Sequence, residues 1–423
     1  MRRAPGWLWL PVAIATSVGA AEPDYPPLLP PDGVARQALL HSVGVQSGTE
    51  QLLQGAARRR KFRAGPYEWD AAAMTQDRKD ASGAKYSEQQ YELQRRFRFP
   101  GKGIIDRRLG DVARDIGDNA YADAWHESAR GLLAEWFAWL RAEDAAALLA
   151  AQVDFGSREV DAVARRVARG DAARIDLQRV EVEQDRLLAS QSEARRRAEE
   201  ARLALLRDYP ELDLVTPAHH PAPVAPQGSD EEWIGRIVAE NHEIELAQGL
   251  ADEAELAATR ARRDRLPDPL IGLHYSDNID QNRSNIGLRI SIPLGVAARS
   301  ADAAIARSQA TIASAESAQV RRSVESTARL DVLNARSMIG QWERLSSAAA
   351  KATAAADALG RAYEAGEIGV AELIAARRQQ LDAKLESGAA SYAAHESLAR
   401  LRLDAHLVWA PSHEEGKPGH RDH

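Results

Sequence analysis

The sequence predicts a mainly helical protein with a small β portion, in which a long helical hairpin and a pair of strands occur twice. Three observations predict this fold class. Long proline-free stretches carry apolar residues at helical spacing, short stretches alternate apolar and polar residues, and the order of these stretches is the same in both halves of the chain. Aromatic residues are only 5% of the 423 residues, while alanine recurs throughout, which is typical of long helices packed through small side chains.

The first 20 residues have the pattern of a secretory signal peptide. Met1-Arg2-Arg3 gives a positive start, residues 7–18 are mostly apolar, and Val18-Gly19-Ala20 ends the segment in small residues. We therefore expect export and a mature chain that begins at residue 21. Later stretches fall short of the ~18 apolar residues that a membrane-spanning helix needs, so any membrane-embedded part would have to consist of strands.

Residues 21–208 are expected to form the first repeat. A Pro-rich start (residues 21–33) precedes a helix over about residues 34–61, which Gly65-Pro66 ends. Alternation then predicts a strand over residues 86–99, after a weakly apolar strand near residues 67–74. The strand over residues 86–99 has one polar and one apolar face; the apolar face carries Tyr91, Leu93, Phe97 and Phe99, with Arg95 as the exception.

A helical hairpin follows these strands. Pro100-Gly101 ends the second strand, and proline is then absent until Pro210, while apolar residues keep helical spacing. The interruption at Gly170-Asp171 predicts a turn between one helix that ends near residue 169 and another over residues 174–207. Residues 209–230 contain five prolines and are expected to be a linker.

Residues 231–410 are expected to form the second repeat. A helix over about residues 231–265 is stopped by Leu266-Pro267-Asp268-Pro269, and strands follow over residues 270–278 and 285–294. A helix over about residues 298–365 and a shorter one returning to residue 410 turn near Gly366. Residues 411–423 are expected to be a flexible tail. In this repeat, Ile290-Ser291-Ile292-Pro293 matches Phe97-Arg98-Phe99-Pro100 of the first.

Helix lengths give these repeats a shape. A helix of about 65 residues spans roughly 100 Å, whereas its partner of about 40 residues spans roughly 60 Å. The helix before the strands adds roughly 50 Å, so two shorter helices stacked end to end match one long helix. Periodicity alone is equally compatible with a solvated coiled coil that encloses no pore.

The strands argue against a simple coiled coil. Transmembrane barrels begin near eight strands, so the four strands of one chain cannot close a barrel. An open sheet in lipid would leave two edges of unpaired backbone groups that lipid cannot satisfy. The chain is therefore expected to oligomerise through its strands, with two or three copies, and the polar strand faces would line a water-filled lumen.

Composition and motifs exclude several functions. The formal net charge is −7, a poor match to nucleic acid, whose phosphates require a basic face. The chain has no cysteine, which excludes disulfides, thiol catalysis and a lipoprotein anchor. Nucleotide-binding and hydrolase motifs are missing, so we expect no catalytic residues and no cofactor. Histidines are weak candidates for transition-metal ligands in the linker and in the tail: His219, His220, His413, His420 and His423.

The order of these elements resembles the TolC-like family of outer membrane efflux proteins. The resemblance covers nearly the whole mature chain. The stretch from Asn241-His242-Glu243 to the prolines at positions 267 and 269 resembles the helix that precedes the family's strands. Residues 361–368, followed by Glu372-Leu373, resemble its hairpin-tip motif. The short length and the run Phe97-Arg98-Phe99-Pro100-Gly101-Lys102 look most like the outer membrane subunits of cobalt–zinc–cadmium-type heavy-metal efflux systems.

The resemblance implies a homotrimer in the outer membrane of a Gram-negative bacterium. Three chains would form a 12-stranded β-barrel in outer membrane lipid, continued by an α-helical tunnel through the periplasm. A periplasmic adaptor and an inner-membrane RND-type pump would supply substrate to a passive exit channel. By the same resemblance, the expected substrates are heavy-metal cations. Two alternatives stay open: a channel for type I protein secretion or drug efflux, and a soluble periplasmic coiled-coil adaptor.

The resemblance also implies where the functional residues lie. Both predicted hairpin turns contain a glycine, which adopts left-handed backbone angles at little cost. The turns would dock the adaptor through Gly170, Asp171, Gly366 and Glu367. Glu372, six residues beyond the second glycine, would line a narrow periplasmic aperture, and Asp176 is its match in the first half.

Overall fold

The computed structural model describes residues 26, 28–79, 81–217, 220–278 and 283–411. The expected signal peptide, His219 and the three tail histidines lie outside the described residues. In chain order the elements are α1 (Asp32–Leu40), α2 (Val43–Ala64), β1 (Trp69–Lys79), β2 (Lys85–Arg96), α3 (Lys102–Ala168), α4 (Arg174–Asp208), α5 (Asp230–Ala239), α6 (His242–Asp264), β3 (Leu270–Asn278), β4 (Arg283–Ser291), α7 (Ala297–Glu364) and α8 (Val370–Asp404).

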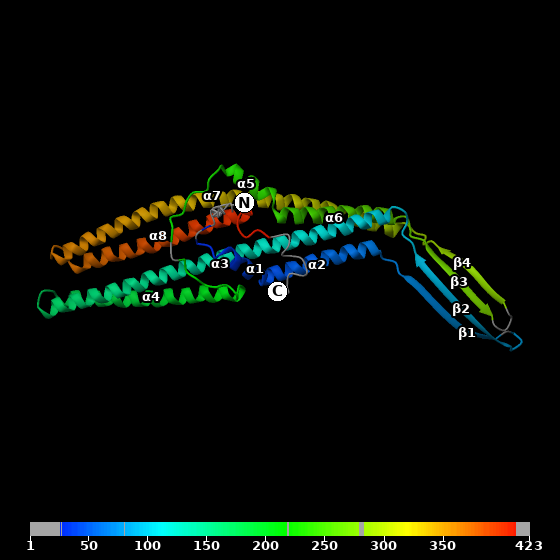
Figure 1. Cartoon of the computed structure of the whole chain (residues 1–423), viewed down its shortest axis with the longest axis horizontal. Coiled ribbons are helices and arrows are strands. Elements are labelled where there is room, and N and C mark those ends of the chain that lie inside the picture. The colour runs from blue at the N-terminus through cyan, green and yellow to red at the C-terminus, as the bar shows by residue number, and fades with distance from the viewer. Residues whose placement is uncertain (1–25, 27, 80, 218–219, 279–282, 412–423) are drawn as a thin grey trace, which may run out of the picture.

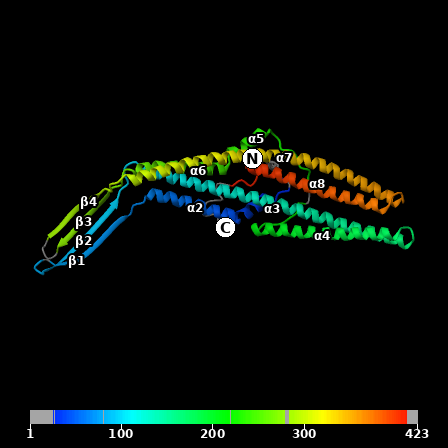
Figure 2. The ribbon, with the colours of Figure 1, turned by 180° about the vertical axis from the view of Figure 1, so that it is seen from behind.

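The helices form an elongated body with the four-stranded sheet at one end (Figure 1). The hairpin turns α3–α4 and α7–α8 both lie at the opposite end. Helices α2, α3, α6 and α7 lead toward the sheet, as the view from behind also shows (Figure 2). With 67 and 68 residues, α3 and α7 each correspond to about 100 Å of helix, as the sequence predicted.

Two helices that the sequence predicted as continuous are broken, and each break is an N-cap. Ser42 separates α1 from α2, and its Oγ accepts a hydrogen bond from Val45 N at 3.4 Å. Asn241 precedes α6, and its Oδ1 accepts from Ile244 N at 3.0 Å. Both capping residues are buried. The prediction of single helices was wrong because these side chains satisfy backbone donors that a continuing helix would pair.

The last helix is also shorter than predicted, since α8 ends at Asp404 and not at residue 410. His406 adopts a left-handed backbone angle, φ 56°, and its N–H donates to Leu403 O at 2.9 Å. Leu407 N donates to Arg402 O at 2.9 Å. These bonds close the helix as a left-handed C-terminal cap does, although glycine usually takes this position.

An aromatic core holds the middle of the body together. Trp125 and Trp136 of α3 are buried against both ends of the described chain. The indole N–H of Trp125 donates to Trp409 O at 2.6 Å, and that of Trp136 donates to Leu28 O at 2.7 Å. The rare aromatic residues are thus concentrated where the N-terminal and C-terminal segments cross the long helix.

Away from this core the helices pack through small residues, as the composition predicted. Many buried positions of α7 fall on two seven-residue series that are offset by four residues. The first series is Ala303, Ala310, Ser317 and Val324, and the second is Ala328, Ala335, Ala349 and Ala356; Asp331, Val332 and Ile339 are also buried. A seven-residue repeat is the pattern of coiled-coil packing, and an insertion of four residues is a stutter that locally unwinds it. Within the described ranges, no helix combines the length and apolar character needed to cross a bilayer.

The sheet is antiparallel in the order β1-β2-β3-β4. The pairs Leu93↔Leu273 and Leu273↔Leu288 place three leucines in one row across the sheet. The same face carries Tyr91, Tyr275, Ile286 and Ile290, and most of these side chains are exposed, Leu288 by 68%. The predicted apolar face of the strands is therefore confirmed, and it is uncovered in one chain.

The opposite face of the sheet is polar. Arg289 Nη1 lies 2.8 Å from Glu92 Oε1, and Gln76 Nε2 donates to Glu88 at 2.8 Å. The outer strands β1 and β4 each pair on one side within the described chain, so each presents a free edge.

The limits predicted for β3 are confirmed, whereas the limits of the other three strands were wrong by a few residues. The ladder between β2 and β3 ends where Phe97 N donates to Pro269 O at 2.9 Å, because proline has no N–H to return the bond.

Candidate functional site

The hairpin turns have matching backbone geometry. Gly170 has φ 81° and its N–H donates to Val167 O at 3.0 Å; Gly366 has φ 79° and donates to Tyr363 O at 3.0 Å. The following residues, Asp171 and Glu367, donate back to Arg166 O and Ala362 O at 2.8 and 2.9 Å. An added Cβ would meet no atom within 4 Å at either glycine, so the backbone angle and not crowding requires glycine there.

The two candidate aperture residues each lie in the first turn of a helix near the turns. Glu372 is exposed on α8, and its side chain makes no ion pair with the part of the chain that the structure describes. Asp176 on α4 lies 3.4 Å from Arg179 Nη1. A carboxylate in the first turn also stabilises the helix through its dipole, so the position alone does not define an aperture. No contact joins the two carboxylates among the described residues.

Basic side chains that the sequence did not point out link the helices near the turns. The guanidinium of Arg166 on α3 lies over the ring of Tyr363 on α7, 4.9 Å from its centre. Arg378 on α8 pairs with Glu183 on α4. Arg377 on α8 lies 3.0 Å from Asp357 Oδ1 on α7. The first two pairs join the two hairpins to each other and involve residues far apart in sequence, which periodicity does not connect; the third pair lies within the α7–α8 hairpin.

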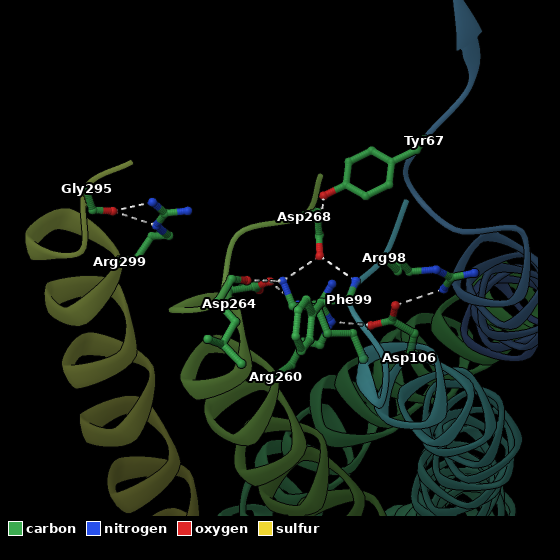
Figure 3. A network of polar contacts seen from close by, with 11 residues as sticks. Tyr67, Arg98, Phe99, Asp106, Arg260, Asp264, Asp268, Gly295 and Arg299 are labelled. Carbon is green, nitrogen blue, oxygen red and sulfur yellow. Dashed lines mark hydrogen bonds and ion pairs between the residues drawn. The ribbon is translucent and has the colours of Figure 1, made fainter. Parts of the chain in front are cut away.

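A buried charge network joins the sheet to the helical body (Figure 3). Lys102, the first residue of α3, is 1% exposed; its Nζ lies 2.8 Å from both Asp268 Oδ1 and Asp264 Oδ1 and donates to Leu266 O at 2.7 Å. Asp268 also accepts from Phe99 N at 2.7 Å and from Tyr67 Oη at 2.6 Å. Burial raises the pKa of Asp268, but the hydrogen bonds from Lys102 and Tyr67 outweigh it and hold the pKa below its usual value.

The network extends one helical turn into the body. Asp106 on α3 is buried and accepts from Arg98 Nη1 at 2.9 Å and from Arg260 Nε at 2.6 Å. Arg260 pairs in turn with Asp264. Three cations thus face three carboxylates, and β2, α3 and the segment before β3 are held at one fixed joint. Nearby, Arg299 Nε donates to Gly295 O at 2.9 Å at the start of α7 (Figure 3).

Three histidines from distant parts of the chain meet in the middle of the body. The ring centres of His126 on α3 and His406 lie 5.4 Å apart, and those of His242 on α6 and His406 lie 4.9 Å apart. His126 Nε2 lies 3.2 Å from Asp404 Oδ1, which Arg130 Nε also contacts at 2.9 Å. Burial, reinforced by the charges of the other two histidines, lowers the pKa of His406 to about 4. Burial also lowers the pKa of His242.

Among the described residues, no group of three or more histidine, aspartate or glutamate side chains is arranged to hold a metal ion. His220 contacts Tyr392 Oη at 3.1 Å and Ser391 Oγ at 2.9 Å, so each of its ring nitrogens has a hydrogen-bonding partner. His219, His413, His420 and His423 lie outside the described residues, and their metal binding stays a prediction.

Comparisons with known proteins identify the fold. No family model and no curated protein sequence matches the chain. Solved structures do. The Campylobacter jejuni CmeC outer membrane channel matches with a TM-score of 0.77 at 13% identity over 91% of this chain and 89% of that one. CusC, whose structures concern folding and transmembrane channel formation, matches with a TM-score of 0.76 at 13% identity. The match covers 88% of this chain and 91% of CusC. The open state of the Neisseria gonorrhoeae MtrE outer membrane channel matches with a TM-score of 0.73 at 17% identity, over 90% of each chain.

These similarities have a clear scope. The matched proteins are described as outer membrane channels or through transmembrane channel formation, and at 13–17% identity the similarity is one of fold. Their TM-scores fall in a narrow range, so the fold does not single out the heavy-metal subtype among them. The predicted TolC-like arrangement of helices and strands is confirmed: the chain has the fold of the outer membrane channel proteins.

Proposed function

We propose that the chain is the outer membrane channel of a tripartite efflux system. One observation carries the proposal: a four-stranded sheet with an exposed apolar face and two free edges lies at the end of long helical hairpins. Exposed apolar surface of this kind is unfavourable in water and favourable in lipid, and free edges in lipid require pairing with another sheet.

Association of three copies would satisfy both requirements. Three sheets give twelve strands, within the range of known transmembrane barrels, and edge β1 of one copy would pair with edge β4 of the next. The face that carries Glu92 and Arg289 would then line a water-filled lumen. Two copies would give eight strands, so the number three rests on the resemblance to the TolC-like family.

The helical body would continue the lumen into the periplasm. Its hairpin turns would dock a periplasmic adaptor through Gly170, Asp171, Gly366 and Glu367, and an RND-type inner-membrane pump would deliver substrate. Glu372 and Asp176 would narrow the periplasmic aperture and attract cations, because carboxylates around a narrow opening focus a negative potential. Heavy-metal cations are therefore the substrates that we favour.

The membrane placement of the sheet can be tested by a matched pair of variants on β4. Leu288→Arg puts a charge on the apolar face, whereas Asn285→Arg puts the same charge on the polar face. Arginine on the lipid face of a barrel costs about 2–4 kcal/mol near the bilayer midplane, and a lumen substitution costs little.

The assay is fractionation of cells that express the full chain, followed by detergent extraction. Leu288→Arg should deplete the outer membrane fraction of the protein, and Asn285→Arg should leave it unchanged. Equal outer membrane yields of the two variants, or a wild-type chain that stays in the soluble periplasmic fraction, would contradict the proposal. Cells that lack the gene should be sensitised to divalent heavy-metal salts; sensitisation only to organic drugs would remove the metal assignment.

A further inference from the structure

A small basic hollow lies at the base of the sheet, where the α2–β1 connection meets the end of β2. Its volume is about 180 Å³, and it is lined by residues 64–67 and 95–98, which include three arginines. Gly65 has φ 83°, and an added Cβ would lie 2.8 Å from the guanidinium carbon of Arg98. The absence of a side chain at Gly65 therefore leaves room for the guanidinium of Arg98.

The arginines of this hollow differ in how their charge is balanced. Arg98 pairs with buried Asp106 at 2.9 Å. Arg95 instead donates from Nε and Nη2 to the carbonyl oxygen of Tyr67 at 3.3 and 3.1 Å, and Arg96 lies over the Tyr67 ring, 5.7 Å from its centre. Neither Arg95 nor Arg96 forms an ion pair with a residue that the structure describes. Two positive charges next to the hollow thus lack a protein counter-charge.

Helix dipoles do not explain these two residues. Basic side chains in the last turn of a helix, such as Lys61 and Arg63 of α2, complement the helix dipole. Arg95 and Arg96 are the last residues of a strand, and the sequence had already marked Arg95 as the one charged residue on the apolar face. Within the described residues, Arg95 has a carbonyl oxygen and an aromatic ring as neighbours but no acidic partner for its charge.

The neighbours of Arg95 indicate where an anionic partner from outside the chain would lie. Trp69 is 58% exposed on the same face, and the Arg95 guanidinium lies over its ring at 5.4 Å from the centre. The exposed Phe97 ring meets Trp69 edge to face, with centres 6.4 Å apart. Exposed aromatic rings beside a long basic side chain are typical of the level where a bilayer's acyl chains give way to its headgroups.

We propose that this hollow binds the phosphate group of an anionic phospholipid, with Arg95 as its main ligand. The inference rests on the proposed function, which places the apolar face in lipid and the base of the sheet at the periplasmic surface of the membrane. The planar guanidinium of Arg95 is already oriented by Tyr67 and Trp69, and an arginine fork suits phosphate oxygens better than an ammonium does. Arg96 adds positive potential at the mouth of the hollow.

The test measures lipid retention by the purified full-length channel. Wild type, Arg95→Gln, Arg95→Lys and the control Arg289→Gln, on the polar face, are reconstituted in phosphatidylcholine vesicles with or without phosphatidylglycerol and re-extracted. Retained phosphatidylglycerol is counted by mass spectrometry, and melting temperatures are compared between the lipids. Arg95→Gln should retain about fivefold less phosphatidylglycerol than wild type and lose its stabilisation by that lipid. Arg95→Lys should retain an intermediate amount, and Arg289→Gln should match wild type.

Different outcomes separate this inference from the proposed function. Equal phosphatidylglycerol retention by wild type and Arg95→Gln would overturn the lipid site, and so would an equal stabilisation of wild type by inorganic phosphate alone. Conductance in phosphatidylcholine bilayers checks that Arg95→Gln still assembles into a channel. If the variant does not assemble, the lipid site is tested on the wild type alone, by whether it retains phosphatidylglycerol in preference to phosphatidylcholine. A wild type that conducts without any lipid preference would overturn only this inference, whereas a wild type that inserts into neither vesicle would overturn the proposed function as well.

Discussion

Asp268→Ala should loosen the joint between the sheet and the helices more than any exposed substitution. The change leaves Lys102, 1% exposed, without its buried partner and removes the acceptor of Phe99 N and Tyr67 Oη. Removing one partner of a buried ion pair typically costs about 3–5 kcal/mol. Because Asp264 and Leu266 O remain next to Lys102, we expect a value near the lower limit, about 3 kcal/mol.

Hydrogen exchange measures this effect at the joint itself. If local opening becomes easier by about 3 kcal/mol, backbone amides at the start of α3 should exchange on the order of 100-fold faster. Amides in the aromatic core around Trp136 should be unaffected. The double variant Lys102→Met with Asp268→Leu should exchange more slowly than Asp268→Ala, because it removes the unpaired buried ammonium, but faster than wild type, because Phe99 N and Tyr67 Oη still lack their acceptor.

The matched control is an exposed pair. Arg336→Gln breaks an ion pair with Asp230 whose side chains are 39% and 50% exposed, and such pairs contribute about 0–1 kcal/mol. If the amides at the start of α3 exchange no faster in Asp268→Ala than in Arg336→Gln, the reasoning that burial makes the Lys102 network a rigid joint is refuted.

Three further predictions concern the turns, the histidines and the aperture. Gly366→Val should abolish efflux while detergent-stable trimers persist, because a β-branched residue at φ 79° disfavours the turn geometry proposed for docking; loss of trimers as well would make the role structural only. Stability should fall as the pH drops from about 6.5 toward 4, since the unfolded chain takes up a proton at His406 that the folded chain resists until about pH 4; His406→Leu should weaken this dependence in thermal melts, and an unchanged dependence would contradict this role of His406. Glu372→Gln should reduce cation selectivity or divalent block in planar bilayers at unchanged trimer yield, and unchanged selectivity would remove Glu372 from the aperture.

Features that depend on local periodicity could be predicted from the sequence. The alternation around Tyr91 and Leu93 gave the correct strand face, and a glycine at each interruption of a long helical pattern marked both turns. The breaks at Ser42 and Asn241 were missed because apolar spacing continues through them, although serine and asparagine are themselves capping signals.

Features that depend on tertiary contacts could not be predicted in this way. His126, His242 and His406 meet only after three helices have packed, and nothing in their spacing connects them. The sequence shows Arg95 as an exception on an apolar face, but it does not show the groups that hold its guanidinium. These are the Tyr67 carbonyl and the Trp69 indole ring, both more than 20 residues away along the chain. The pairing of Lys102 with Asp268 likewise joins the two halves of the chain.

Cysteine cross-linking between the outer strands tests the central claim most directly. The native chain has no cysteine, so single cysteines can be placed without background: Ala73→Cys on β1, combined in turn with each position of β4 (Arg283–Ser291). If β1 of one copy pairs with β4 of the next in a closed ring, oxidation in membranes should give a covalent ladder that ends at the trimer, for one register of positions and only when both cysteines are present. Products that stop at monomers or dimers, or a ladder that continues beyond three, would contradict a closed trimeric channel.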